Sequence, residues 1–151
     1  MSKKTTLFLD IDGVLHPAGA VSQNPDGTIS MIGAFRWEGI LRDCLSDFPD
    51  VALILHSTWR LMWDTDEELK QHLPAWLGAR LNGTTPRTVM SRFASIQQYC
   101  KDHAVERYVI VDDEPAAFPK CLPELIVCDS RTGLTGDSIE ALVWRALKAL
   151  H

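Results

Sequence analysis

Two pairs of aspartates directly follow short apolar runs in this sequence. Asp10 and Asp12 form the first pair, with Gly13 beside them, and Asp112 and Asp113 form the second. Neighbouring carboxylates repel one another, and they offer the hard oxygen ligands that Mg²⁺ prefers in proteins. Gly13 permits a sharp turn without a steric penalty. The two pairs therefore predict one divalent-cation site, provided that the fold brings them together.

A second set of residues has the chemistry to bind a phosphate group. Ser57, Thr58 and Arg60 follow a third apolar run. A hydroxyl and a backbone N–H can hold one phosphate oxygen, and a guanidinium can add a bidentate contact. Arg92 opens a predicted helix, where a cation and the helix dipole act together on an anion, so it is favoured over Lys101 near the helix end. Ser57 and Thr58 remain alternatives for the hydroxyl.

The apolar patterning predicts strands that alternate with helices. Strands are expected at residues 5–9, 51–55, 108–111 and 125–128. Helices are expected at residues 37–48, 66–73 and 91–103, and after a capping box at residues 137–140, where the apolar stripe is Ile139, Leu142, Val143, Ala146, Leu147 and Leu150. Residues 20–22 and 28–32 flank an Asn-Pro-Asp-Gly turn and predict a hairpin, whereas residues 78–88 resemble a loop with at most one short strand.

This order of elements indicates an α/β fold, with βαβ units around a central parallel sheet flanked by helices. Parallel sheets of this kind bind ligands beyond the carboxyl ends of their strands. The aspartate pairs and the serine-threonine segment all fall at predicted strand ends. The predicted fold therefore brings the candidate residues to one edge of the sheet.

The composition is that of one ordinary globular domain spanning residues 1–151. Apolar residues make up 46% and charged residues 23%, so a packed core is expected. The net charge of −5 argues against a general nucleic-acid coat, which needs a basic face. No run approaches the roughly 20 apolar residues of a membrane helix. Four scattered cysteines without a CxxC pair predict reduced thiols in the cytoplasm.

The order of the motifs resembles that of the haloacid dehalogenase (HAD) superfamily of phosphatases. The segments FLDIDGVLHP, HSTWR and VIVDDEP are similar to small HAD domains found alone in bacteria or associated with RNA-repair proteins. The resemblance implies a Rossmann-like HAD fold with a small hairpin flap. The intervals between the motifs leave no room for a large cap, so the site is expected to be open to a bulky substrate, such as a phosphorylated polymer end or protein.

The resemblance also implies a role for each aspartate. Asp10 would be the nucleophile and a Mg²⁺ ligand. Asp12 would be the general acid and base, and its backbone carbonyl would also bind the metal; Asp112 and Asp113 would complete the metal shell. The chemistry agrees, because a carboxylate can attack phosphorus and form an aspartyl phosphate, while an alkoxide is a poor leaving group without a proton.

The same resemblance implies that the hydroxyl of Ser57 binds the transferring phosphoryl group, or that of Thr58 if the register differs by one residue. Arg92 would stabilise the nucleophile and the phosphate. The family commonly has lysine at that position, and a planar guanidinium cannot approach an anion as a point charge does. The expected substrate is a phosphorylated small molecule, or a nucleic-acid or protein phosphate, with no membrane involved. The oligomeric state is left open.

Other functions compete with phosphohydrolysis. A non-catalytic HAD-fold module could bind metal or phosphate beside a partner protein, but such a module has no chemical need for both Asp10 and Asp12. A receiver domain would carry its phosphorylated aspartate after a middle strand, where this chain has Ser57. Dehalogenase chemistry dispenses with Mg²⁺ and with the second acid of the DxD pair. These comparisons favour the phosphohydrolase.

Overall fold

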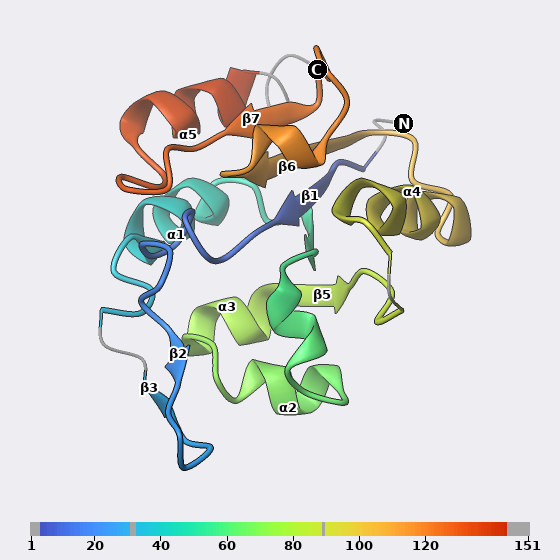
Figure 1. The fold of residues 1–151 in the computed structure, drawn as a ribbon. Coiled ribbons are helices and arrows are strands. Elements are labelled where there is room, and N and C mark those ends of the chain that lie inside the picture. Colours follow the sequence, from blue (N-terminus) through green and yellow to red (C-terminus); the bar gives the residue numbers. More distant parts are fainter. Residues whose placement is uncertain (1–3, 31–32, 89, 145–151) are drawn as a thin grey trace.

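The computed structural model describes residues 4–30, 33–88 and 90–144, which form a five-stranded parallel sheet covered by helices (Figure 1). The strands of this sheet are β1 (Thr6–Leu9), β4 (Ala52–Leu55), β5 (Leu81–Thr84), β6 (Tyr108–Asp112) and β7 (Leu125–Val127). The α-helices are α1 (Glu38–Ser46), α2 (Asp66–Lys70), α3 (Ala75–Arg80), α4 (Arg92–Asp102) and α5 (Gly136–Leu142). Two 3-10 helices, η1 (Thr58–Leu61) and η2 (Pro115–Ala117), follow β4 and β6. The predicted α/β fold with a central parallel sheet is confirmed.

The sheet buries side chains on both faces, which explains why its strands are continuous apolar runs rather than alternating ones. Leu7 and Leu9 of β1 belong to the larger core cluster, which includes Leu41 of α1. Phe8 belongs to the smaller cluster with Ile96 of α4. Figure 1 shows α1 and α4 on opposite sides of β1. Each of these five side chains has no exposed surface and contributes about 1.5–3 kcal/mol.

The strand order β5-β4-β1-β6-β7 places β1 at the centre of the sheet. The chain passes from β1 to β4 and β5 on one side, and then crosses through α4 to β6 and β7 on the other. This reversal creates a topological switch point at the carboxyl ends of β1, β4 and β6. Ligands of doubly wound α/β folds bind at such a point.

A small antiparallel hairpin projects between β1 and α1. It consists of β2 (Ser22–Gln23) and β3 (Ile29–Ser30). The Thr28 N–H donates to the Asp26 carboxylate (3.0 Å), and Gly27 has a φ of +87°. Asp26 thus accepts a backbone hydrogen bond within the turn, and Gly27 takes the positive φ, as expected for these residue types. Between the first two motifs the described residues hold only this hairpin and α1. The predicted small hairpin flap is therefore present.

One predicted loop is partly helical. Residues 75–80 form α3, whose start is set by Pro74, whereas the helix expected at residues 66–73 ends at Lys70. Gly78 made a helix harder to predict here, because glycine is a poor helix former. The position is tightly packed, since a Cβ on Gly78 would lie 3.3 Å from the Lys70 carbonyl oxygen. The one short strand allowed in residues 78–88 is β5.

The predicted capping box of the last helix was wrong by two residues. The Thr135 hydroxyl accepts from the Ser138 N–H (3.3 Å), and the Ser138 hydroxyl accepts from the Thr135 N–H (3.2 Å). Of the predicted apolar stripe, Leu142 is buried and Ile139 and Val143 pack against the core. The remaining three positions, Ala146, Leu147 and Leu150, lie outside the described residues.

Two expectations about the whole chain can be compared with the structure. Among the described residues, no helix combines the length and apolarity that a bilayer crossing requires. All four cysteines are free thiols: Cys44, Cys100, Cys121 and Cys128.

Candidate functional site

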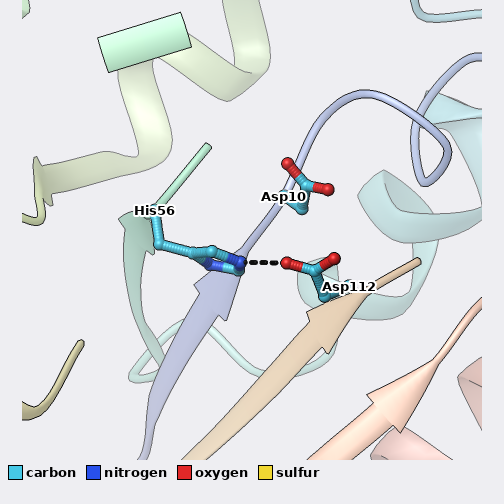
Figure 2. A group of neighbouring side chains, drawn as sticks. All are labelled: Asp10, His56 and Asp112. Carbon is cyan, nitrogen blue, oxygen red and sulfur yellow. Dashed lines mark hydrogen bonds and ion pairs between the residues drawn. The ribbon is translucent and has the colours of Figure 1, made fainter. Parts of the chain in front are cut away.

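Three buried polar residues lie at the carboxyl ends of the three central strands, at the same level of the sheet. The register pairs Leu9 of β1 with the last apolar residues of β4 and β6. Asp10 comes next on β1, His56 next after β4, and Asp112 is the last residue of β6. Figure 2 shows their side chains converging. The exposed fraction is 1% for Asp10 and 0% for the other two residues, so the cluster is withdrawn from water.

The cluster of Asp10, His56 and Asp112 has the composition of a metal site. One potential ligand atom of each residue lies within 4.8 Å of the others. His56 Nε2 is 2.7 Å from Asp112 Oδ2, and an ionised carboxylate only accepts, so the imidazole N–H is the donor. Sequence reasoning gave His56 no role. Its one signal is its position directly after a buried strand, level with Asp10.

Arg92 supplies the positive charge of the cluster. It is the first residue of α4, after the N-cap residue Ser91. Its Nη1 atom lies 3.1 Å from Asp10 Oδ2 and 2.9 and 2.8 Å from the two carboxylate oxygens of Asp112. Lys101 is exposed in the last turn of the same helix. Of the two basic candidates, the structure therefore brings Arg92 to the aspartates.

The electrostatics of the cluster shift the pKa values of its two carboxyl groups in opposite directions. Burial, and then the charge of Asp112, raise the pKa of Asp10 from 3.8 to about 8. Burial would also raise the pKa of Asp112, but the hydrogen bond from His56 and the charge of Arg92 lower it to about 2. Burial lowers the pKa of His56, so this imidazole is neutral at pH 7. The Asp112 carboxylate is thus fully partnered, whereas Asp10 is costly to ionise.

Asp113 lies beside Asp10 without a cation of its own. Burial, and then the charge of Asp112, raise the pKa of Asp113, and its carboxyl group interacts with that of Asp10. Asp10 Oδ1 is buried and receives no donor from the described residues. Gly13, with a φ of +78°, makes room for the Asp113 carboxyl, because a Cβ on Gly13 would collide with it. The Asp10 and Asp113 carboxyl groups share a hydrogen bond, so one of them must hold a proton when no cation is bound.

The side chain of Asp12 has hydrogen-bond partners outside this group. Its Oδ1 atom is 2.6 Å from His16 Nε2, and its Oδ2 atom accepts from Trp59 Nε1 at 3.2 Å. The side chain is 37% exposed, so it is the acid of the first pair that water or a substrate can reach. The four predicted acids therefore do not share one place, because Asp12 has separate partners. No spacing pattern in the sequence indicates this contact between Asp12 and His16.

The phosphate-binding candidates after β4 differ in accessibility. Ser57 is fully buried and is the N-cap residue of η1, where its hydroxyl accepts from the Trp59 N–H at 3.1 Å. Thr58 is exposed. Arg60 is 2% exposed and donates to the backbone carbonyls of His56 (2.8 Å), Ser57 (3.0 Å) and Pro86 (3.1 Å). The guanidinium of Arg60 therefore holds this loop through three backbone carbonyls, and its contact with a phosphate stays a prediction.

Comparisons with known proteins agree with this architecture. A family model described as the HAD domain in Swiss Army Knife RNA repair proteins matches residues 6–139. That interval includes all of the candidate site residues. No curated protein and no solved structure gives a significant match.

Proposed function

Because the chain belongs to the family of HAD domains in Swiss Army Knife RNA repair proteins, we propose that it is a Mg²⁺-dependent phosphohydrolase acting through an aspartyl phosphate. HAD domains are usually phosphatases. The observation that carries the proposal is the environment of Asp10, a buried carboxylate at the centre of the sheet with Arg92 on one oxygen and no donor on the other. A group of this kind is typical of a reacting centre rather than of a structural ion pair.

The described residues fit a divalent cation in two ways. The first is the buried cluster of Asp10, His56 and Asp112, but there the His56 N–H and the Arg92 guanidinium already satisfy Asp112. The second uses the carboxyl groups of Asp10 and Asp113, with the backbone carbonyl of Asp12. We favour the second, because a cation there would replace the proton that the Asp10 and Asp113 carboxyl groups otherwise share, and no guanidinium or imidazole contact to Asp113 is seen among the described residues.

Each residue then has a chemical role. One Asp10 oxygen attacks phosphorus, the bond from phosphorus to the leaving oxygen breaks, and the leaving alkoxide takes a proton from the carboxyl group of Asp12. The Asp12 carboxylate next takes a proton from water, which attacks the phosphorus of the aspartyl phosphate, releases phosphate and restores Asp10. Arg92 stabilises the ionised nucleophile. A bound Mg²⁺ would supply positive charge that favours ionised Asp10 and offsets the charge of the phosphoryl oxygens.

The proposed phosphoryl-binding groups come from the loop after β4. The Ser57 hydroxyl donates its own proton even while it accepts from Trp59, because a hydroxyl is both donor and acceptor. The exposed hydroxyl of Thr58 is the alternative. Arg60 contributes indirectly, because its contacts with the carbonyls of His56 and Ser57 fix the course of this loop.

The proposed substrate is a phosphate at the end of a nucleic acid, as in RNA repair. Two observations support a large substrate: the family description, and the absence of any domain over the site among the described residues. We also propose that the protein acts in the cytoplasm, where its four free cysteines would remain reduced.

The test compares hydrolysis of p-nitrophenyl phosphate with that of 3′- and 5′-phosphorylated oligoribonucleotides, in Mg²⁺ and in EDTA. We expect the highest kcat/KM on one of the oligonucleotides and no activity in EDTA. Asp10→Asn should lower kcat by at least about 10³-fold. Asp43→Asn removes an exposed charge from α1 and serves as the matched control.

Two outcomes would contradict this proposal in different ways. Equal activity of the wild-type protein and Asp10→Asn would remove the nucleophile and favour the non-catalytic binding module. Activity on small esters, without any on nucleic-acid ends, would leave the chemistry intact and overturn the substrate class.

A further inference from the structure

His16 is a buried histidine with a contact on each ring nitrogen. It has no exposed surface, although it lies in the loop that leaves β1. Its Nε2 atom is 2.6 Å from Asp12 Oδ1, and its Nδ1 atom is 3.0 Å from the backbone nitrogen of Phe35. Burial of an imidazole is costly unless both nitrogens are satisfied. Here both are satisfied, and one of the partners is the proposed general acid and base.

The backbone contact fixes the tautomer of this imidazole. A backbone N–H can only donate, so His16 Nδ1 must be the acceptor and carries no hydrogen. The ring proton of the neutral imidazole is therefore on Nε2, where it is donated to Asp12 Oδ1. The Phe35 N–H on Nδ1 thus determines that Nε2 carries the proton. His16 is therefore the donor, and Asp12 the acceptor, in the hydrogen bond between them.

A second donor holds the other oxygen of the same carboxylate. Trp59 Nε1–H donates to Asp12 Oδ2 at 3.2 Å. The rings of His16, Phe35 and Trp59 pack in mutual contact, with centroids 5.2 to 5.7 Å apart. Each carboxylate oxygen has two lone pairs, so each keeps one that can carry the catalytic proton. The two N–H donors thus fix the direction of Asp12 without occupying all its acceptor sites.

The same contact joins the two ends of the hairpin. The chain leaves His16 towards β2, passes through β3 and returns at Phe35. Phe35 has a φ of +60°, which is uncommon for a residue with a bulky side chain. This conformation presents its N–H to His16. The imidazole therefore connects the base of the hairpin to the carboxylate of Asp12.

We propose that His16 is a positioning residue, whose Nε2–H aims the Asp12 carboxyl group at the leaving oxygen and couples it to the base of the hairpin. The inference rests on the proposed phosphohydrolase function and deepens it. A general acid contributes most when the leaving group is a poor one, so loss of its alignment has a recognisable kinetic signature. A residue that is needed for folding alone would not produce that signature.

The kinetic test compares an alkyl phosphate, which has a poor leaving group, with p-nitrophenyl phosphate, which has a good one. We use kcat/KM because it reports the first phosphoryl transfer. For His16→Leu, we expect a loss of about 100-fold or more on the alkyl ester and of less than about tenfold on the aryl ester. His16→Gln keeps an amide N–H near the Nε2 position and should recover most of the alkyl activity. Trp59→Phe removes the second donor but keeps the ring, and should shift the same ratio by a smaller factor.

The tautomer is tested separately from catalysis. Nitrogen NMR of the wild-type imidazole should show a protonated Nε2 and an unprotonated Nδ1 for His16. Equal losses on both esters in His16→Leu and Trp59→Phe, or a hydrogen on Nδ1, would overturn the proposal. If the wild-type protein hydrolyses neither these esters nor the phosphorylated oligoribonucleotides, and Asp10→Asn behaves identically, the proposed function itself has failed, whereas the NMR result still decides the hydrogen-bond arrangement.

Discussion

Asp10 is costly to ionise in the folded protein because burial and the charge of Asp112 both oppose its negative charge. Folding raises the pKa of this carboxyl from 3.8 to about 8, so the folded state holds a proton that the unfolded state releases in this interval. The stability of the metal-free protein should therefore fall as the pH rises through this window.

We predict that Asp10→Asn stabilises the metal-free protein, and that the gain in Tm over the wild type increases between pH 4 and pH 8. Asparagine is neutral throughout this range, whereas the aspartate must be ionised or hold its proton at a cost. Thermal unfolding in EDTA at several pH values measures the difference. A difference in Tm that is constant over this range would contradict the prediction, and Asp43→Asn controls for the loss of a charge.

A second residue-scale prediction concerns the room that Gly13 leaves for Asp113. Gly13→Ala should lower the affinity for Mg²⁺ by about 10- to 100-fold, because the new methyl group would displace the Asp113 carboxyl. Gly27→Ala is the matched control, since Gly27 has a similar φ of +87° with nothing within 4 Å of its Cβ position. Both variants should lose about 1–2 kcal/mol from the positive φ. Isothermal titration with Mg²⁺ separates them, and equal affinities would contradict the prediction.

The acids of the site could be found from the sequence, because each follows a buried apolar run and parallel strands align their carboxyl ends. His16 and His56 could not be given roles in this way. Their functions depend on which carboxylate each imidazole meets across the fold, and a lone histidine carries no spacing signal. Arg60 illustrates the opposite case. Its position after β4 suggested a phosphate contact, but the sequence could not show that its guanidinium donates to backbone carbonyls.

At the scale of elements, the central strands were predicted within one or two residues because they are bounded by charged or turn-forming residues. The short helix α3 was not predicted. It has six residues, includes Gly78, and is stabilised by packing of Leu77 into the core rather than by its own periodicity. Short elements that depend on tertiary packing leave a weak pattern in the sequence.

The start of α5 allows an element-scale prediction. Thr135→Ala should lower the free energy of unfolding by about 1 kcal/mol, because it removes the hydroxyl that accepts from the Ser138 N–H. Glu140→Ala alters the residue that the sequence had assigned to the capping box, and it should have little effect. Urea denaturation of both variants measures the difference. If Glu140→Ala were the more destabilising, the cap of this helix would be misplaced.

At the scale of the molecule, the ends of β1 and β6 gather acidic groups at one edge of the sheet, beside Arg92 at the start of α4. A cation that binds there binds only the folded state, so it stabilises the protein by mass action. Mg²⁺ at 100 times its Kd should add about 2.7 kcal/mol. For a chain of this size that corresponds to a rise in Tm of about 2–4 °C per kcal/mol.

We predict that this rise in Tm disappears in Asp113→Asn and persists in Asp12→Asn. The proposed metal contact of Asp12 is its backbone carbonyl, and its side chain is held by His16 and Trp59. Thermal unfolding with and without Mg²⁺ measures the effect, with Ca²⁺ as a comparison. A response to Mg²⁺ in Asp113→Asn would instead favour the buried group of Asp10, His56 and Asp112 as the metal site.

The guanidinium of Arg92 contacts carboxylates from two different strands, and it therefore acts as a cross-link between distant parts of the chain. Without it, the buried Asp112 carboxylate would lose a cationic partner and Asp10 would be still harder to ionise, and removing one partner of a buried ion pair is strongly destabilising. The ion pairs of Arg92 with Asp10 and Asp112 therefore matter both for the stability of the fold and for the proposed reaction. A mutant lacking this arginine would report on both properties at once.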